Sequence, residues 1–237
     1  MDKVLHPASS RGTANYGWLK ANYSFSFANY FDPGKVQFGL LRVLNDDFVQ
    51  GGMGFGTHPH ENMEIISIPL KGEIRHKDSM DNTKVIKAGE VQVMSAGTGV
   101  EHSEFNPSKE ELNMLQIWIF PEKNGLQPRY GQKDYSSLLK KNELINIVTP
   151  KNDEAENALW INQNAYLHLG EFESGRKIEY ELKDKSHGVY VFLIEGEAEI
   201  DNSVLRKRDA IGIKATESFS IMFKNQSKVL LIEVPMN

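Results

Sequence analysis

MEIISIPLKGEIRH (63–76) decides the fold class of this chain. β-branched and other apolar residues fill the stretch on both sides of a single glycine, so it predicts two short strands joined by a tight turn. Three further stretches have the same character: VQFGLLRVL (36–44), KVIKAGEVQVMSAG (84–97) and NMLQIWIFP (113–121). Short strands at this spacing are typical of an all-β sandwich or barrel.

Polar runs divide these stretches from one another. NDD (45–47), DSMDN (78–82) and NPSKEE (106–111) are rich in residues that favour turns and loops. We therefore expect the chain to reverse direction at each of the three.

The second half of the chain contains a weak echo of the first. VYVFLIEGEAEI (189–200) resembles EIISIPLKGEIR (64–75), and VLRKRDAIGI (204–213) resembles VIKAGEVQVM (85–94). The echo predicts that one β unit occurs twice. Unrelated hairpins would also look alike, so these segments alone leave both interpretations open.

A polar segment separates the two halves. PEKNGLQPRYGQKDYSSLLKKNE (121–143) is rich in proline and glycine at its start. It is expected to connect an N-terminal unit (1–135) with a C-terminal unit (144–237). The run around 135–141 predicts a short helix within this connection.

Composition narrows the class of protein. The chain has 237 residues, 40% hydrophobic and 25% charged, as in a globular protein with an apolar core. Its 27 basic and 32 acidic residues give a formal charge of −5, which argues against direct contact with nucleic acid. No apolar stretch reaches the length of a membrane span, and the first residues lack the apolar core of a secretory signal. The chain has no cysteine, so disulfides and zinc–thiolate sites are excluded, and we expect a cytoplasmic protein.

Two pairs of residues suggest a metal site. His58 and His60 stand one residue apart in THPHENME (57–64), and alternate residues of a strand project from the same face. GTGVEHSEFN (97–106) supplies His102 and Glu104 at the same spacing. On neighbouring strands, the two pairs would present three imidazoles and a carboxylate to one point.

This donor set suits a catalytic metal. Nitrogen and oxygen ligands without thiolate are typical of iron(II), manganese, nickel, copper or zinc. Four ligands on a six-coordinate ion leave two positions open, and an open position distinguishes catalytic from structural sites. One HxH pair alone would also fit a surface or core pair, but the second pair favours the metal. Glu64, four residues beyond His60, is expected to be a fifth ligand or an acceptor that orients an imidazole. The other histidines lack partners at ligand spacing and are expected to be structural or surface residues: His6, His76, His168 and His187.

Several long blocks closely resemble the pirin family. They are GWLKANYSFSFANYFDP (17–33), LRVLNDD (41–47), GFGTHPHENMEI (54–65), GEVQVMSAGTGVEHSEFN (89–106) and LQIWIFP (115–121). The resemblance covers most of residues 10–135, and the continuation GLQPRYGQ is most similar to short bacterial pirins with quercetinase activity. Tyr23 is a departure, because many family members carry histidine there.

The resemblance implies an all-β protein of two cupin barrels packed face to face, with short helices at their connection. In that family the residues matching His58, His60, His102 and Glu104 hold the metal. The glutamate matching Glu64 is usually not a ligand, which favours a position beside the ligands. In the C-terminal half, the positions that match the ligands by counting are Leu182, Asp184, Ile221 and Phe223. That half is therefore expected to be a degenerate cupin without a metal.

The resemblance also implies a function. A metal-dependent dioxygenase like quercetin 2,3-dioxygenase would cleave a flavonol with O2 and release carbon monoxide, with Glu104 as the base. The expected cofactor is one divalent transition metal, iron(II) in first place, with manganese, nickel, copper, cobalt or zinc as alternatives. The expected partners are a small aromatic substrate and O2, bound by a monomer. Residues near the ligands are expected either to form an apolar pocket wall or to belong to the barrel core: Phe55, Met63, Met94 and Phe105.

The alternative function is regulatory. A redox-sensing iron-binding protein would modulate a transcription factor or a metabolic enzyme through a protein partner. Flavonol-dependent oxygen uptake separates the two hypotheses.

Overall fold

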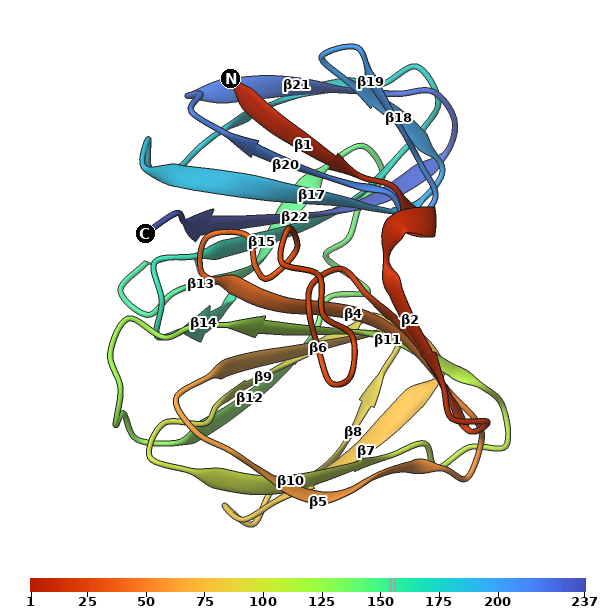
Figure 1. Cartoon of the computed structure of the whole chain (residues 1–237), viewed down its shortest axis with the longest axis vertical. Helices are drawn as coiled ribbons and strands as arrows, with labels where there is room; N and C mark the ends of the chain where they lie inside the picture. The colour runs from red at the N-terminus through yellow and green to blue at the C-terminus, as the bar shows by residue number, and fades with distance from the viewer. Residues whose placement is uncertain (154, 156) are drawn as a thin grey trace.

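The computed structural model describes residues 1–153, 155 and 157–237. In that part of the chain the regular structure consists of twenty-two strands and one 3₁₀ turn, η1 (Ala8–Ser10). The strands form two barrels stacked along the long axis of the molecule (Figure 1). The prediction of an all-β fold with two barrels is confirmed. None of the described residues forms a helix with the length and apolar character that a membrane crossing requires.

The N-terminal barrel is built from a seven-stranded and a four-stranded sheet. The larger sheet has the order β12 (Arg129–Asp134), β9 (Glu90–Ser95), β6 (Glu64–Lys71), β11 (Leu112–Ile119), β4 (Leu41–Val49), β3 (Leu19–Tyr23) and β2 (Gly12–Asn15). The smaller sheet has the order β5 (Gly54–His60), β10 (Val100–Phe105), β7 (Glu73–Asp78) and β8 (Thr83–Lys87).

The C-terminal barrel repeats this plan. Its larger sheet has the order β1 (Asp2–His6), β20 (Ala210–Lys214), β17 (His187–Glu195), β22 (Ser227–Pro235), β15 (Tyr166–Phe172), β13 (Leu144–Pro150) and β14 (Leu159–Ile161). Its smaller sheet has the order β16 (Lys177–Glu181), β21 (Ser218–Phe223), β18 (Glu197–Ile200) and β19 (Ser203–Arg206). Gly72 and Gly196 occupy the same turn in the two halves, both with positive φ. The shared order supports the duplication that the sequence echo predicts.

The two halves exchange one edge strand each. β1, at the start of the chain, pairs with β20 in the C-terminal barrel. β12, from the segment that leads into the C-terminal half, pairs with β9 in the N-terminal barrel. The segment 121–143 is therefore more than a linker, because it completes the first barrel.

The larger sheets of the two barrels pack against each other. Alternate residues of their central strands form one buried core: Ile66, Ile68, Leu115, Ile117, Tyr190, Phe192, Leu230 and Ile232. The opposite faces of the same strands line the barrel interiors, because strand side chains alternate. This shared core stabilises the face-to-face arrangement.

The turn predicted at NDD (45–47) is wrong. Asn45, Asp46 and Asp47 lie inside β4, which has β11 on one side and β3 on the other. Pairing on both sides overrides the local turn preference of these residues. The other two polar runs do separate strands.

The short helix predicted around 135–141 is also wrong. The amides of Leu138 and Leu139 both donate to the carbonyl of Tyr135, which makes a single turn. The residues between β12 and β13 form turns and no helix. The hydroxyl of the buried Tyr135 instead donates to the carbonyl of Ile147 at 2.7 Å.

Candidate metal centre

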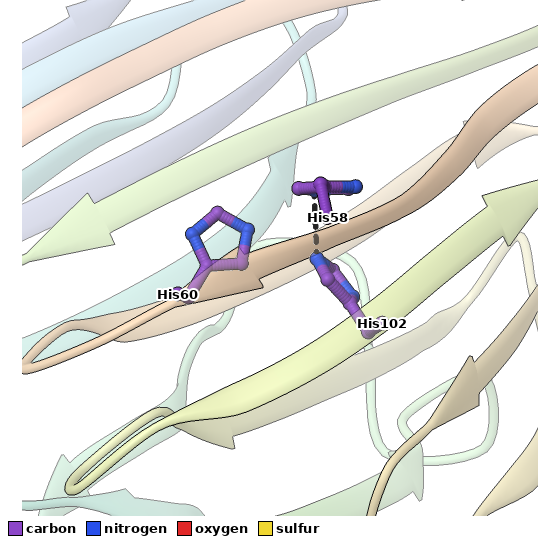
Figure 2. Close-up of side chains that lie close together, drawn as sticks. All are labelled: His58, His60 and His102. Carbon is purple, nitrogen blue, oxygen red and sulfur yellow. Dashed lines mark hydrogen bonds between the residues drawn. The ribbon is translucent and has the colours of Figure 1, made fainter.

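Three imidazoles meet inside the N-terminal barrel. β5 and β10 pair so that His58 lies directly opposite His102, with His60 two residues along. The ring centroids are 4.9 Å apart for His58 and His60, 4.5 Å for His58 and His102, and 4.8 Å for His60 and His102. Figure 2 shows His58 and His102 facing each other with His60 beside them. The alternate-residue spacing on neighbouring strands therefore brings the three rings together, as predicted.

The separation of the ring nitrogens fits a shared ion. Nε2 of His58 and Nε2 of His102 are 3.1 Å apart. Two nitrogens bound to one ion at about 2.1 Å and about a right angle would lie about 3.0 Å apart.

Neighbouring acceptors assign the proton of His58. Its Nδ1 lies 2.8 Å from the carbonyl oxygen of Gly56, which can only accept, so His58 carries its proton on Nδ1. The Nε2 lone pair of the neutral ring then points toward His102.

A second chain of contacts assigns the proton of His102. Nε2 of His76 donates to Oδ2 of Asp78 at 3.1 Å, which leaves Nδ1 of His76 as an acceptor. Nδ1 of His102 lies 3.4 Å from that atom and donates to it. The Nε2 lone pairs of His58 and His102 therefore face each other, and a cation between them would remove their repulsion.

Burial keeps the rings of His60 and His102 neutral, as metal ligands must be. Burial and the neighbouring His58 lower the pKa of His60 to about 4. Burial, with His58, His60 and His76, lowers the pKa of His102 to about 2. Neutral imidazoles at physiological pH are ready to bind a metal without releasing protons.

Glu104 joins the cluster through His102. It lies on the same face of β10, and together with His76 and His102 it forms a second group of donor atoms within 4.8 Å of one another. Gln116 donates to its Oε2 at 2.9 Å, and Ser67 donates to its Oε1 at 3.4 Å. Burial nevertheless raises the pKa of Glu104 to about 7.

A polar row faces Glu104 from the larger sheet. Each member lies opposite the next on the neighbouring strand, in the order Tyr23, Asn45, Gln116, Ser67, Gln92 and Gln132. The row divides the barrel interior into two small apolar clusters, one around Val49 and Met114 and the other around Ile65 and Met94. The metal centre therefore lies within a polar layer.

A cavity of about 420 Å³ opens beside the imidazole cluster. His58, His60 and Glu104 line it, together with the aromatic side chains of Trp18, Tyr23, Phe27, Phe55 and Trp118. Of the four predicted wall residues, only Phe55 borders this cavity. Met63 and Met94 pack with Ile65 in the separate apolar cluster, and Phe105 is exposed. Strand alternation turns Phe105 to the outer face of β10, whereas Met63 and Met94 lie in the interior cluster around Ile65.

Glu64 lies apart from the imidazoles. Ser95 Oγ donates to its Oε2 at 2.7 Å, and Asn162 Nδ2 of the C-terminal half donates to its Oε1 at 3.1 Å. It shares a face of β6 with Ile66, toward the second barrel. The structure thus places Glu64 in the contact between the halves and not beside the ligands.

The sequence prediction did not assign four residues to the site: His76, which was expected to be structural or on the surface, and Asp78, Asn45 and Asp47. His76 and Asp78 lie one strand away from His102, so only the pairing of β7 with β10 reveals them. Asn45 and Asp47 were assigned to a turn. A usable signal exists, because a polar residue interrupts the apolar alternation of β4, β6, β9 and β11 in turn.

The fold and this cluster define a two-cupin protein with a metal-binding centre in its first barrel. The pirin family profile matches residues 5–119, and the profile of the quercetinase C-terminal cupin domain matches residues 147–234. The chain belongs to the pirin family. It is 40% identical over 236 residues to quercetin 2,3-dioxygenase of Escherichia coli K12, with 98% of each chain covered.

Solved structures agree. The crystal structure of bacterial pirin YhhW from Escherichia coli in complex with nickel(II) has a TM-score of 0.92 and 37% identity, over 99% of both chains. Another crystal structure of YhhW has a TM-score of 0.93, over 99% of this chain and 98% of that one. The nickel complex of this relative and the donor cluster of this chain together support a metal-binding site.

Proposed function

We propose that this pirin is a metal-dependent dioxygenase that cleaves a flavonol-type substrate with O2 and releases carbon monoxide. The observation that carries the proposal is a cluster of three imidazoles beside an aromatic-lined cavity whose wall also includes the buried Glu104. The 40% identity to quercetin 2,3-dioxygenase over nearly the whole chain supports the same activity.

The proposed metal ligands are His58, His60, His102 and Glu104. The donor set is three nitrogens and one oxygen, which suits a divalent transition metal, and we propose iron(II) as the native ion with nickel(II) as the first alternative. When bound, the metal would supply Lewis acidity toward a substrate oxygen. Elemental analysis of protein purified without added metal tests the identity of the ion.

Glu104 is the proposed base. Its carboxyl group lines the cavity in which a substrate hydroxyl would bind. Gln116 and Ser67 hold the carboxylate by one hydrogen bond to each oxygen, which fixes its orientation toward the cavity. Trp18, Phe27 and Phe55 provide apolar surface for an aromatic ring.

The dioxygenase is favoured over the regulatory alternative. The relative that is 40% identical over nearly the whole chain carries the enzyme's name. The cavity beside the ligands is also large enough for a small molecule, since ligand pockets begin at about 300 Å³.

The test is oxygen uptake that depends on added flavonol, with carbon monoxide measured in the headspace. We expect both in the metal-loaded protein and neither in His60→Ala. His168→Gln, a histidine exchange in the other barrel, is the matched control and should retain both signals. No carbon monoxide with any bound divalent metal would reject the proposal.

We also propose the organisation of the chain. An N-terminal metal-binding unit (1–135) and a C-terminal unit without ligands (144–237), joined through 121–143, fit the two profile matches. A cytoplasmic monomer is the proposed state, because each large sheet is already covered by the other. Light scattering and cell fractionation test these two points.

A further inference from the structure

Two buried oxygens in the cavity wall have no hydrogen-bond partner among the described residues. They are Oδ1 of Asn45 and Oδ1 of Asp47, on residues only 2% and 4% exposed. Both residues line the same cavity as His58, His60 and Glu104. They approach it from β4 of the larger sheet, whereas the metal ligands lie on the smaller sheet.

The residue between them shows that β4 can satisfy a buried carboxylate. Asp46 points to the other face of the strand, where its Oδ1 accepts from Nδ2 of Asn113 at 2.8 Å and Nη1 of Arg208 at 3.2 Å. Buried polar atoms in folded proteins are nearly always paired. Two exceptions on the inner face, at a cavity wall, therefore mark groups that are available to a ligand.

The surroundings indicate which ligand group fits. Burial, with the negative charges of Asp46 and Glu104, raises the pKa of Asp47 well above its ordinary value. The carboxyl of Asp47 can thus donate a hydrogen bond as well as accept one, while Oδ1 of Asn45 can only accept. A hydroxyl group both donates and accepts, so it can pair with either residue. An ether oxygen or a bare ring carbon cannot donate to Asn45.

We propose that Asn45 and Asp47 form an anchoring pair that binds hydroxyl groups of the substrate, so that the pocket selects a polyhydroxylated aromatic compound. This inference rests on the proposed function for the reacting end of the ligand and adds the recognition of its other end. The buried indole Nε1 of Trp118, which also has no partner among the described residues, supplies a donor for a ligand oxygen in the same cavity.

The test compares two flavonols on the metal-loaded protein in the absence of oxygen. Quercetin carries hydroxyl groups on both ring systems, and 3-hydroxyflavone keeps only the reacting one. Quenching of the fluorescence of Trp18 and Trp118, which line the cavity, reports binding. We expect wild-type protein to bind quercetin about tenfold more tightly than 3-hydroxyflavone.

Substitutions should remove this preference. In Asn45→Leu and Asp47→Leu the ratio of the two dissociation constants should fall to near one. Asp47→Asn keeps two polar atoms and should retain most of the preference for quercetin. Asn152→Leu changes an exposed residue that does not border the cavity and should keep the wild-type ratio. The melting temperature of the ligand-free leucine variants should stay the same or rise, because an unpaired buried group is removed.

Equal affinity of the wild-type protein for the two flavonols would overturn the proposal without any variant. So would an unchanged ratio in the folded leucine variants, or a large fall in their melting temperature, which would assign the pair a structural role. Carbon monoxide release is measured separately on the wild-type protein. If no carbon monoxide is released but the binding ratios are as expected, the dioxygenase function is rejected and the anchoring pair is supported.

Discussion

The two barrels share a strand order but differ in the row of side chains across the middle of the larger sheet. In the N-terminal barrel the row is polar: Tyr23, Asn45, Gln116, Ser67, Gln92 and Gln132. In the C-terminal barrel the corresponding residues are Asn146, His168, Leu231, Val191, Ile211 and Leu5. Apolar residues thus replace the polar ones at the centre of the second sheet.

The interiors differ accordingly. The C-terminal barrel holds one continuous apolar core that includes Val191, Ile211 and Leu231. Ile221 and Phe223, which match ligand positions by counting, are fully buried in that same core. In the N-terminal barrel, a polar layer and a cavity interrupt the apolar core. The comparison teaches that one fold supports either a stable core or a site, depending on a few inward positions.

The largest expected effect is on bound metal, which should be lost on substitution in the N-terminal barrel and kept on substitution in the C-terminal barrel. His102→Ala removes the imidazole that belongs to both donor groups, so bound metal should fall from about one per chain to near zero. Flavonol-dependent oxygen uptake should be lost with it. Metal content measured by mass spectrometry checks this, with His168→Gln as the control in the second barrel. Full metal occupancy in His102→Ala would contradict the assigned centre.

Exchanging one residue between the rows tests the comparison itself. Ile211→Gln places an amide in the apolar core and should lower the free energy of unfolding by about 4 kcal/mol, from lost burial and an unpaired polar group. The reciprocal Gln92→Ile should change it by less than about 1 kcal/mol, because neither amide atom of Gln92 has a partner among the described residues. Urea unfolding of the metal-free protein measures both. Equal losses would show that the two rows are under the same constraint.

The polar layer should also make stability depend on pH. The pKa of Glu104 is about 7 in the folded protein and 4.5 as its ordinary value. The folded state therefore holds the proton of Glu104 more tightly than the unfolded state does. The resulting contribution to the free energy of unfolding is full below about pH 4.5 and is lost as the pH rises through about 7. The loss reaches up to about 3 kcal/mol in the metal-free protein.

Comparison with Glu104→Gln isolates this contribution, because the histidines are common to both proteins. The difference between the unfolding free energies at about pH 5 and pH 8 should be smaller in the variant than in the wild type. A variant with the same pH dependence as the wild type would show that Glu104 is ionised throughout this range.

A further expected effect, on metal affinity, concerns the support of His102. His76→Ala removes the acceptor for Nδ1–H of His102, so metal affinity should fall by about 10- to 100-fold. His76→Gln keeps an acceptor oxygen and should lose less. Competition with a chelator measures both affinities, and identical values for wild type and His76→Ala would remove His76 from the site.

Local patterns predicted the part of the site that depends on local geometry. The alternation of a strand is enough to place His58 and His60 on one face, and the same holds for His102 and Glu104. The strand-rich stretches predicted an all-β sandwich or barrel, whereas the expectation of two barrels came from the resemblance to the pirin family. The sequence did not predict contacts that depend on the register of several strands, such as those of His76 and of the polar row.

Two errors have a common physical cause. Asn45 and Asp47 have turn chemistry but lie in a strand with neighbours on both sides. Glu64 has the spacing of a ligand, but it projects from the outer face of β6, where Asn162 of the other half binds it. In both cases a distant segment determines the role of the residue, which a single sequence does not reveal.

The exchange of edge strands has a consequence for synthesis of the protein. As the chain leaves the ribosome, the first barrel lacks its outer strand until β12 is made, and β1 waits for β20 near the end of translation. A nascent chain that stalls between these points presents unpaired backbone at an open sheet edge, which can recruit other chains. Completion of the N-terminal barrel is thus tied to synthesis of the segment that follows it, and completion of the C-terminal barrel to the first strand of the chain.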